Sequence, residues 1–389
     1  MSEKPWAGRH LLLLSGPMGT GHTQASLALA KYAGERYPDL KVTHINVAEL
    51  MTPGLRFFFT DFYHFLLRHM SLIWLYMYHS SNVPPAHAPL FRKVMSVWRY
   101  TFEKRLMKRI AECDPDYIIC THFLPAEIIG EAKREQKVNC FTSSVITDFS
   151  VHWVYIQPKL DLFFVANLDM SLIMHLRGIE REKIYITGCP IFPGFSKSYS
   201  DEDKKRLRAE LGLPQDANLV MVMMGGENIG RVAAITKTLL DNFPGISVLA
   251  MTSKDNNLYQ QIDKMKAKYP GRVFPVPFTT RVNDYMALCY LVVSKPGGIT
   301  ISECMAMKKP IIVMDPIPGH EEKNAAYLST HGLAAFSERL SDLTLLDAEF
   351  GATWMQMVSN NHNIYEQHNA SAKILKVVIE WEGNSQVQN

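Results

Sequence analysis

Residues 294–324 combine glycines, a carboxylate and polar side chains in a spacing that suits the binding of a sugar nucleotide. Gly297 and Gly298 follow an apolar run and open a helical pattern. Two glycines at a helix start leave backbone N–H groups uncovered, and the helix dipole adds positive charge there, so the position predicts a phosphate site. Glu303 lies about one helical turn further on, where it could bind a ribose attached to that phosphate.

The next loop of this stretch supplies polar side chains for the part of the ligand beyond the phosphates. Gly319 forms a turn, and His320, Glu321 and Asn324 follow it at the start of another helical pattern. We expect these three side chains to bind hydroxyl groups of a sugar. The structural alternatives are a plain surface charge for Glu303 and ordinary helix capping for Glu321 and Asn324.

The two motifs of this stretch, KPGG-x-T-x-SE and P-x-PG-x-E-x-x-N, resemble the donor site of family 28 glycosyltransferases. The resemblance is closest to monogalactosyldiacylglycerol synthases and processive diacylglycerol glucosyltransferases, and more distant to the peptidoglycan enzyme that adds N-acetylglucosamine to lipid I. It implies a UDP-sugar bound by Gly225, Gly226, Phe278, Gly297, Gly298, Thr300, Glu303, Gly319, His320, Glu321 and Asn324. His320 stands where the family usually has Gln, which leaves the transferred sugar open.

The composition is that of a folded two-domain protein without a nucleic-acid or metal signature. The chain has 389 residues, 47% of them hydrophobic and 20% charged, which is too long for one typical core. A net charge of +3 gives no argument for nucleic acid. Six scattered cysteines without a CxxC pair argue against a zinc site or disulfides and favour a reducing compartment. The start of the sequence shows no secretory pattern, so we expect a cytoplasmic protein.

Residues 10–36 read as a strand, a glycine-rich turn and a helix, the opening unit of a doubly wound α/β domain. Residues 16–23 fit a P-loop except that His22 replaces the lysine, and without that lysine an ATPase is disfavoured. The GxGH-x-x-A form resembles the first loop of family 28 enzymes instead, which implies that His22 lies near the donor phosphates or the acceptor. The alternative is that His22 only caps the helix.

Asp148 ends a predicted strand, in the segment TDFSVHWVY. Carboxyl ends of strands line the ligand site in this architecture. The pattern TD-x-x-x-H-W is similar to the segment where glycolipid synthases place their proposed base, which implies that Asp148 takes the proton of the acceptor hydroxyl. A solvated Asp has a pKa near 3.9, so burial must raise that pKa, or His22 and His152 must share the work. Helix capping by Asp148 is the alternative.

An aromatic segment, residues 55–81, suggests contact with a membrane surface. Its polar residues Asp61, His64, Arg68 and Ser71 recur at helical spacing, and aromatic residues fill much of the rest. Charges within the run exclude a membrane-spanning helix, which leaves a buried helix or one lying in the interface. For the interface we predict contacts by Phe58, Phe62, Phe65 and Trp74.

A cationic segment follows the aromatic one. Its basic residues are Arg92, Lys93, Arg99, Lys104, Arg105, Lys108 and Arg109, with Glu103 as the one acid among them. Such a segment attracts anionic lipid headgroups, by roughly 1 kcal/mol per basic residue close to the surface. The alternative is a solvated helix face.

The strand, glycine turn and helix pattern restarts at residue 218, an internal echo of residues 10–34. We therefore predict an α/β protein of GT-B architecture, with two Rossmann-like doubly wound domains facing across a cleft. The predicted domains are an acceptor and membrane-facing domain over 1–195 and a donor-binding domain over 196–365. Residues 366–389 are predicted to form a helix that packs back toward the first domain, followed by a tail.

These features predict an inverting glycosyltransferase that moves a hexose from a UDP-sugar to a diacylglycerol-like lipid and forms a β-glycolipid. We expect it to lie peripherally on the inner face of the cell membrane, against an anionic surface. Glycine N–H groups and helix dipoles would offset the charge of the departing diphosphate, so we expect no metal and no other cofactor. The alternatives are a polyprenyl-linked or other hydrophobic acceptor, a UDP-sugar 2-epimerase, and a non-catalytic membrane-binding relic.

Overall fold

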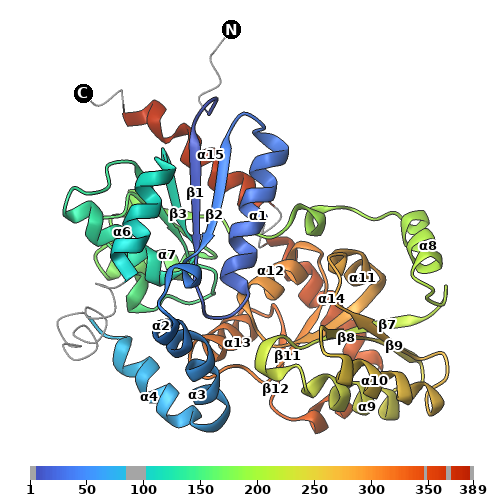
Figure 1. Cartoon of the computed structure of the whole chain (residues 1–389). Coiled ribbons are helices and arrows are strands. Elements are labelled where there is room, and N and C mark those ends of the chain that lie inside the picture. The colour runs from blue at the N-terminus through green and yellow to red at the C-terminus, as the bar shows by residue number, and fades with distance from the viewer. Residues whose placement is uncertain (1–5, 85–101, 346–347, 365–368, 386–389) are drawn as a thin grey trace. The chain divides into compact units, whose positions relative to one another are not determined.

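The computed structural model describes residues 6–84, 102–345, 348–364 and 369–385, and its chain forms two compact units. The first unit comprises Met1–Pro193, Pro318–His320 and Asn369–Asn389, and the second comprises Gly194–Ile317 and Glu321–His368. Each unit is built on its own six-stranded sheet (Figure 1). The acceptor and donor roles predicted for the two halves stay predictions.

The first unit contains a wholly parallel sheet in the order β2-β1-β3-β4-β5-β6. Its strands are β1 (His10–Ser15), β2 (Lys41–Asn46), β3 (Tyr117–Cys120), β4 (Phe141–Val145), β5 (Leu162–Val165) and β6 (Ile184–Ile186). The main flanking helices are α1 (Gly21–Arg36), α6 (Phe123–Arg134) and α7 (Leu168–Leu176). The four leucines of β1 are at most 1% exposed, so both faces of the sheet are covered, as continuous apolar runs predict.

The chain returns to the first unit at its carboxyl end. Helix α15 (Ala370–Ser385) contacts α1, and its residues Ile374 and Val378 join the core cluster formed by β1 and α1 (Figure 1). The ring of Trp381 lies 5.7 Å from that of Phe141 in β4. Helix α15 is therefore part of the first core, although more than 170 residues of the second unit precede it in the sequence.

The second unit repeats the design with a parallel sheet in the order β12-β11-β10-β7-β8-β9. Its strands are β7 (Asn218–Met223), β8 (Ile246–Ser253), β9 (Val273–Pro277), β10 (Cys289–Ser294), β11 (Ile311–Met314) and β12 (Ala335–Ser337). Its helices are α8 (Asp201–Glu210), α9 (Arg231–Asn242), α10 (Asn256–Lys264), α11 (Val282–Leu288), α12 (Gly298–Ala306), α13 (His320–Thr330) and α14 (Ala348–Ile364). Both Val220 and its neighbour Met221 in β7 are buried, so this sheet is also covered on both faces.

Both sheets have a switch point where the strand order reverses. In the first unit the switch lies between β1 and β3, and in the second it lies between β7 and β10. Ligands of open α/β sheets bind outside the carboxyl ends of the strands at such a point. The loops that follow these four strands are therefore where each unit is built to hold a ligand.

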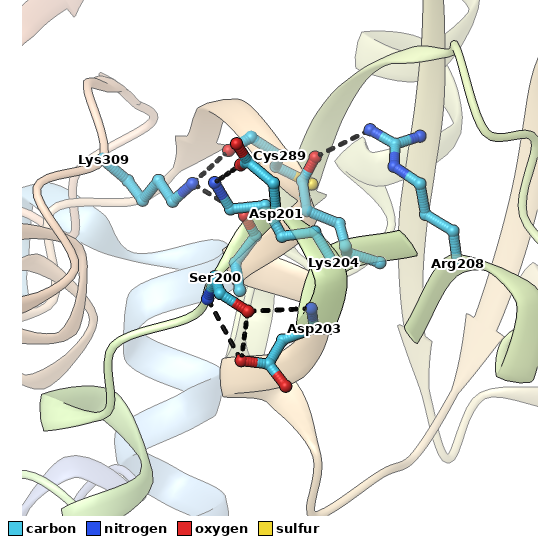
Figure 2. Close-up of polar contacts among 9 residues, drawn as sticks. Ser200, Asp201, Asp203, Lys204, Arg208, Cys289 and Lys309 are labelled. Atoms are coloured by element: carbon cyan, nitrogen blue, oxygen red, sulfur yellow. Dashed lines mark hydrogen bonds and ion pairs between the residues drawn. The ribbon is translucent and has the colours of Figure 1, made fainter. Parts of the chain in front are cut away.

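Charged side chains hold helix α8 and the start of strand β10 in place (Figure 2). Ser200 and Asp203 form a capping box at the start of α8, which satisfies backbone N–H groups there. At the other end of α8, Arg208 donates hydrogen bonds to the Pro214 and Ala217 carbonyls, at 2.7 and 3.0 Å. Lys309 Nζ donates to the Cys289 carbonyl at 2.6 Å. These contacts fix the strand that leads into the glycine loop of the second unit.

The aromatic segment of the first unit is a series of short helices. It consists of α2 (Pro53–Phe57), a π-helical turn (Phe58–Phe62), α3 (Tyr63–His69) and α4 (Ser71–Ser81). Met70 interrupts the series with backbone angles φ −139° and ψ 46°. Within the described residues, the helices all fall short of the length and apolarity needed to cross a membrane. The π turn and the break at Met70 change which residues share a face, so the single helical stripe predicted through Ser71 is wrong.

Candidate functional site

The glycine loops of the second unit lie at its switch point. Gly297 is the N-cap residue of α12, and as a glycine it has no side chain to cap the helix. The first backbone N–H groups of α12 therefore remain available to a ligand. Gly225 and Gly226 follow β7, the strand next to β10, and Gly226 has a φ of +61° that favours glycine. The predicted phosphate-binding glycines are thus brought together within one unit.

Two buried side chains tie the loop before α12 to the loop before α13. Glu321 is 3% exposed, accepts a hydrogen bond from Lys295 Nζ at 2.6 Å and accepts another from the Ile317 N–H at 2.9 Å. Asn324 is fully buried and donates from Nδ2 to the Pro296 carbonyl at 3.0 Å. These contacts position the two loops relative to each other. Direct contact of either residue with a sugar stays a prediction.

Glu303 is a carboxylate of the second unit whose pKa is raised by burial. It lies in α12 with part of its surface exposed, while burial of the carboxyl group raises its pKa to about 8. Burial is the one cause of this shift, and no hydrogen bond or ion pair within the described chain contributes. This partial burial argues against the alternative of a plain surface charge. A carboxyl group held this way gains most when a ligand supplies hydroxyl donors.

The remaining predicted donor residues lie at separate places. Thr300 is half-buried in the first turn of α12, next to the glycine loop. Phe278 follows β9, is 58% exposed and lies 5.0 Å from Lys254 Nζ. Three strand spacings, about 14 Å, separate β9 from β10, so Phe278 marks the outer limit of this site. Gly319 has a φ of +99°, and His320 begins α13; both group with the first unit.

The first unit brings His22 and Asp148 together at the carboxyl ends of its central strands. His22 lies in the first turn of α1, with Nδ1 2.7 Å from the Thr121 carbonyl oxygen and 2.9 Å from Thr147 Oγ1. Burial lowers the pKa of His22, and the negative charge of Asp148 opposes that shift. Since the ring contacts β3 and β4 loops and not its own helix, the capping alternative for His22 is wrong.

Asp148 lies in a bend after β4, and no helix begins beside it. The capping alternative for Asp148 is therefore wrong as well. The cap of the next helical turn (Trp153–Tyr155) is His152, whose Nδ1 accepts a hydrogen bond from the Val154 N–H at 3.2 Å. Nε2 of His152 lies 3.1 Å from the Tyr78 carbonyl oxygen. Both ring nitrogens of His152 are thus engaged in structure, and its predicted share in catalysis stays untested.

His122 is a residue of this site that the sequence reasoning missed. It follows β3, is fully buried and lies with its ring centroid 4.6 Å from that of His22, at an interplanar angle of 88°. Its ring packs on the backbone of Gly16, where a β-carbon would lie 2.1 Å from the ring. The signal was available, because a histidine directly after an apolar strand satisfies the same rule that selected Asp148.

This packing gives a stability prediction for Gly16. Replacement of Gly16 by alanine is expected to destabilise the protein by about 2–3 kcal/mol, because the buried His122 ring cannot move away from the added methyl group. Gly34→Ala is the matched control, since a β-carbon at Gly34, inside α1, meets nothing within 4 Å. Urea unfolding of both variants measures the difference, and equal stabilities would refute the packing argument.

The aromatic segment exposes apolar side chains, although mostly not those predicted. Of the four predicted contacts only Phe65 is largely exposed, at 48%, whereas Phe58, Phe62 and Trp74 are half-buried. The other exposed large apolar residues of the segment are Phe57, Met70, Leu72, Ile73 and Tyr76, and Leu72 reaches 80%. We call Phe57, Phe65, Met70, Leu72, Ile73 and Tyr76 the apolar patch. Four of its six members, Met70, Leu72, Ile73 and Tyr76, lie at the break or in α4.

The cationic segment is described in part. Arg92, Lys93 and Arg99 lie outside the described residues. In the helix formed by 102–113, Phe102, Leu106 and Ile110 are buried at i, i+4 and i+8. Its basic residues Lys104, Arg105, Lys108 and Arg109 are exposed, and Arg109 pairs with Glu112 at 2.7 Å. This half of the segment is a solvated basic face, in agreement with either reading of the charge pattern.

The fold places the chain among GT-B proteins. It aligns with UDP-GlcNAc 2-epimerase from Neisseria meningitidis at a TM-score of 0.63 and 13% identity, covering 95% of this chain and 100% of that one. With MurG from Acinetobacter baumannii the TM-score is 0.58 at 13% identity, covering 95% and 99%. With the Anabaena protein Alr3699/HepE, solved with UDP-glucose, it is 0.55 at 16%, covering 96% and 99%. These likenesses confirm the predicted architecture of two Rossmann-like domains.

The sequence comparisons match the two halves of the chain to two related family models. Residues 22–191 match the family model for monogalactosyldiacylglycerol (MGDG) synthase, and residues 236–379 match that for the glycosyltransferase family 28 C-terminal domain. The chain is 24% identical over 385 residues to the processive diacylglycerol beta-glucosyltransferase of Bacillus licheniformis, covering 96% of this chain and 95% of that one. It is 28% identical over 374 residues to a probable chloroplastic MGDG synthase of Glycine max, covering 92% and 68%. The two models together cover most of the chain, and these matches confirm the predicted resemblance to family 28 glycosyltransferases.

Proposed function

We propose that this glycosyltransferase moves a hexose from a UDP-sugar to a diacylglycerol-like lipid and forms a β-glycolipid. The names of the relatives support the acceptor, since both the bacterial and the plant relative are named as enzymes of diacylglycerol glycosylation. The observation that carries the donor half is the uncapped start of α12 with Glu303 one to two turns further along. Together they offer N–H groups to a diphosphate and a carboxyl group to the ribose.

The second unit would bind the donor without a metal ion. The N–H groups of α12 and of the loop after β7 would offset the charge that develops on the departing UDP. Lys295 lies between these loops, held by Glu321, and a β-carbon on Gly225 would lie 3.8 Å from Lys295 Cε. The structures of Anabaena Alr3699/HepE with UDP and with UDP-glucose show that a protein of this architecture binds such ligands.

The first unit would supply the base for transfer. The acceptor hydroxyl oxygen attacks the anomeric carbon, a new C–O bond forms, and the bond from that carbon to the UDP diphosphate oxygen breaks. Asp148 takes the hydroxyl proton. His22, which interacts electrostatically with Asp148, assists in accepting that proton. A single displacement on an α-linked donor inverts the configuration and gives a β-linkage.

The apolar patch would hold the enzyme on the membrane where its lipid acceptor lies. The exposed face of α4 and the exposed basic face of 102–113 belong to the same unit as Asp148. Apolar side chains at the acyl boundary and basic ones at anionic headgroups are the two elements of interfacial binding. We propose a peripheral location on the inner face of the cell membrane, in the cytoplasm.

This location predicts the effect of removing the patch. The double variant Leu72→Ser, Tyr76→Ser is expected to bind vesicles of anionic phospholipid at least about tenfold more weakly, because two largely exposed apolar side chains no longer enter the lipid. Leu168→Ser, Leu176→Ser in α7 is the matched control, since these leucines are 70% and 76% exposed in the same unit. Vesicle co-sedimentation compares the two, and an equal loss in both variants would contradict a specific role for the patch.

The decisive experiment incubates the purified protein with a panel of UDP-sugars and membrane lipids and identifies the lipid products by mass spectrometry. A β-hexosyl diacylglycerol is the expected product. Sugar transfer only to a polyprenyl-linked lipid would overturn the proposed acceptor. Conversion of UDP-N-acetylglucosamine without any acceptor would indicate an epimerase. Donor binding without turnover, unchanged by Asp148→Asn, would indicate a non-catalytic protein.

A further inference from the structure

The contacts of His22 determine which of its ring nitrogens can accept a proton. Nδ1 lies 2.7 Å from the Thr121 carbonyl oxygen, and a carbonyl oxygen can only accept a hydrogen bond. Nδ1 therefore carries a hydrogen, and in the neutral ring the lone pair is on Nε2. Burial lowers the pKa of His22, which favours this neutral form.

Thr147 adds a second contact to the same side of the ring. Its Oγ1 lies 2.9 Å from Nδ1, and the residue is 4% exposed in the loop after β4, directly before Asp148. The Thr121 carbonyl and the Thr147 hydroxyl thus both contact Nδ1, and they lie in the loops after two neighbouring strands. Two contacts at Nδ1 restrict the orientation of the ring, and this restriction also determines where Nε2 lies.

His122 borders the ring of His22 from a third direction. Its own Nδ1 accepts the Leu124 N–H at 3.1 Å and so caps α6, which places its hydrogen on Nε2. That Nε2 is buried without a hydrogen-bond partner in the described chain. Asparagine would satisfy the cap and phenylalanine would supply the ring, each without this unsatisfied donor. Histidine meets both needs in one residue.

We propose that Thr147 and His122 are positioning residues for the transfer step: with the Thr121 carbonyl they hold the His22 ring so that its Nε2 lone pair faces the reacting hydroxyl and Asp148. The inference rests on the proposed function, because it assigns His22 to the proton-transfer site. It adds two residues that touch neither substrate. Their effect reaches the reaction through the tautomer and the plane of one imidazole ring.

The tautomer is tested first, in the full-length protein labelled with ¹⁵N-histidine. Long-range ¹H–¹⁵N spectra distinguish Nδ1–H from Nε2–H imidazole, and His22→Gln identifies the His22 signals among the 14 histidines. We expect Nδ1–H in the neutral ring. An Nε2–H tautomer would overturn the inference, whether or not the protein transfers sugar.

Two matched pairs of variants then test the positioning role. Thr147→Val is expected to lower kcat about tenfold with the donor KM unchanged, and Thr147→Ser, which keeps the hydroxyl, to retain wild-type kcat. Thr147→Val should also shift the His22 ring signals, whereas Thr147→Ser should leave them in place. An unchanged kcat in Thr147→Val, or an equal loss in the serine variant, would overturn the role of Thr147.

The second pair separates the cap from the ring of His122. His122→Asn keeps a capping acceptor and is expected to lower kcat about tenfold, since the ring that borders His22 is gone. His122→Phe keeps a ring and is expected to retain kcat while lowering Tm, since the cap is lost. The reverse pattern would show that His122 acts only as a cap. Absence of glycosyl transfer by the wild type would refute the proposed function and leave the spectroscopic result intact.

Discussion

Replacement of Glu303 by glutamine is expected to raise the Kd for UDP about 30-fold at pH 8, because an amide forms weaker hydrogen bonds to ribose hydroxyls than a carboxylate does. The effect should be large because the carboxyl group has no competing hydrogen bond or ion pair in the described chain and is already partly desolvated. Isothermal titration with UDP measures it. An unchanged Kd would remove the central observation behind the proposed donor site.

The pH dependence of UDP binding tests the same assignment with a defined sign. Burial raises the pKa of Glu303 to about 8, so at neutral pH the free protein holds this group mainly protonated. Hydroxyl donors of a ribose favour the carboxylate, so binding releases a proton and affinity should increase from pH 6 to pH 8, by at most about tenfold per pH unit. In Glu303→Gln this increase should disappear, apart from the titration of the UDP phosphate near about pH 6.

Thermal unfolding distinguishes a lost ligand contact from a damaged fold. A carboxyl group whose pKa is raised in the folded state stabilises the protein below its unfolded pKa, and this contribution is lost as pH rises through the folded pKa. Glu303→Gln should therefore have a Tm a few °C above that of the wild type at pH 8, with little difference near pH 5. Glu202→Gln, at an exposed position in α8, is the control. A lower Tm together with weaker binding would point to misfolding.

The fold was predictable because its signals are local. Apolar runs such as residues 11–14 and 219–222 are long enough for strands and continuous enough for sheets covered on both faces. Glycine turns after the first strand of each half mark the carboxyl ends where loops begin. These rules led to the two Rossmann-like units without knowledge of any long-range contact.

The use of individual side chains depends on contacts between loops, which spacing does not show. Glu321 and Asn324 are predicted to bind a sugar, and the structure adds contacts to Lys295 and Pro296, nearly 30 residues earlier, that the spacing did not show. His122 was missed because its place in the site depends on packing against Gly16 and His22, which lie about 100 residues away in the sequence. Sequence spacing placed these residues on loops that follow the central strands, and it left open which of their side chains point outward.

The aromatic segment shows a third reason for error, the assumption of a regular helical period. A stripe drawn at 3.6 residues per turn runs from Asp61 to Ser71, but the π turn before Tyr63 and the break at Met70 reset the faces. The most exposed large apolar side chains of the segment are those of Leu72 and Tyr76. The structure exposes apolar side chains in this segment, and the predicted membrane contacts of Phe58, Phe62, Phe65 and Trp74 stay predictions.

The second large effect is expected at Asp148. Asp148→Asn keeps the size of the side chain and removes its basicity, so kcat should fall about 1,000-fold, within the range for loss of a general base. The Kd for UDP should stay unchanged, because the groups proposed to bind its diphosphate and ribose, at α12 and after β7, lie in the second unit and Asp148 in the first. Single-turnover transfer to diacylglycerol measures kcat, and UDP titration measures the Kd.

The role of His22 makes the Asp148 result interpretable. Asp148 raises the pKa of His22 against the effect of burial, so Asp148→Asn should lower the pKa of His22 and leave its ring neutral over a wider pH range. If the two groups act as one proton-accepting pair, the double variant Asp148→Asn, His22→Gln should lose little more activity than the worse single variant. Losses that multiply would indicate two separate roles. Asp169→Asn, exposed in α7 of the same unit, is the control that should retain full activity.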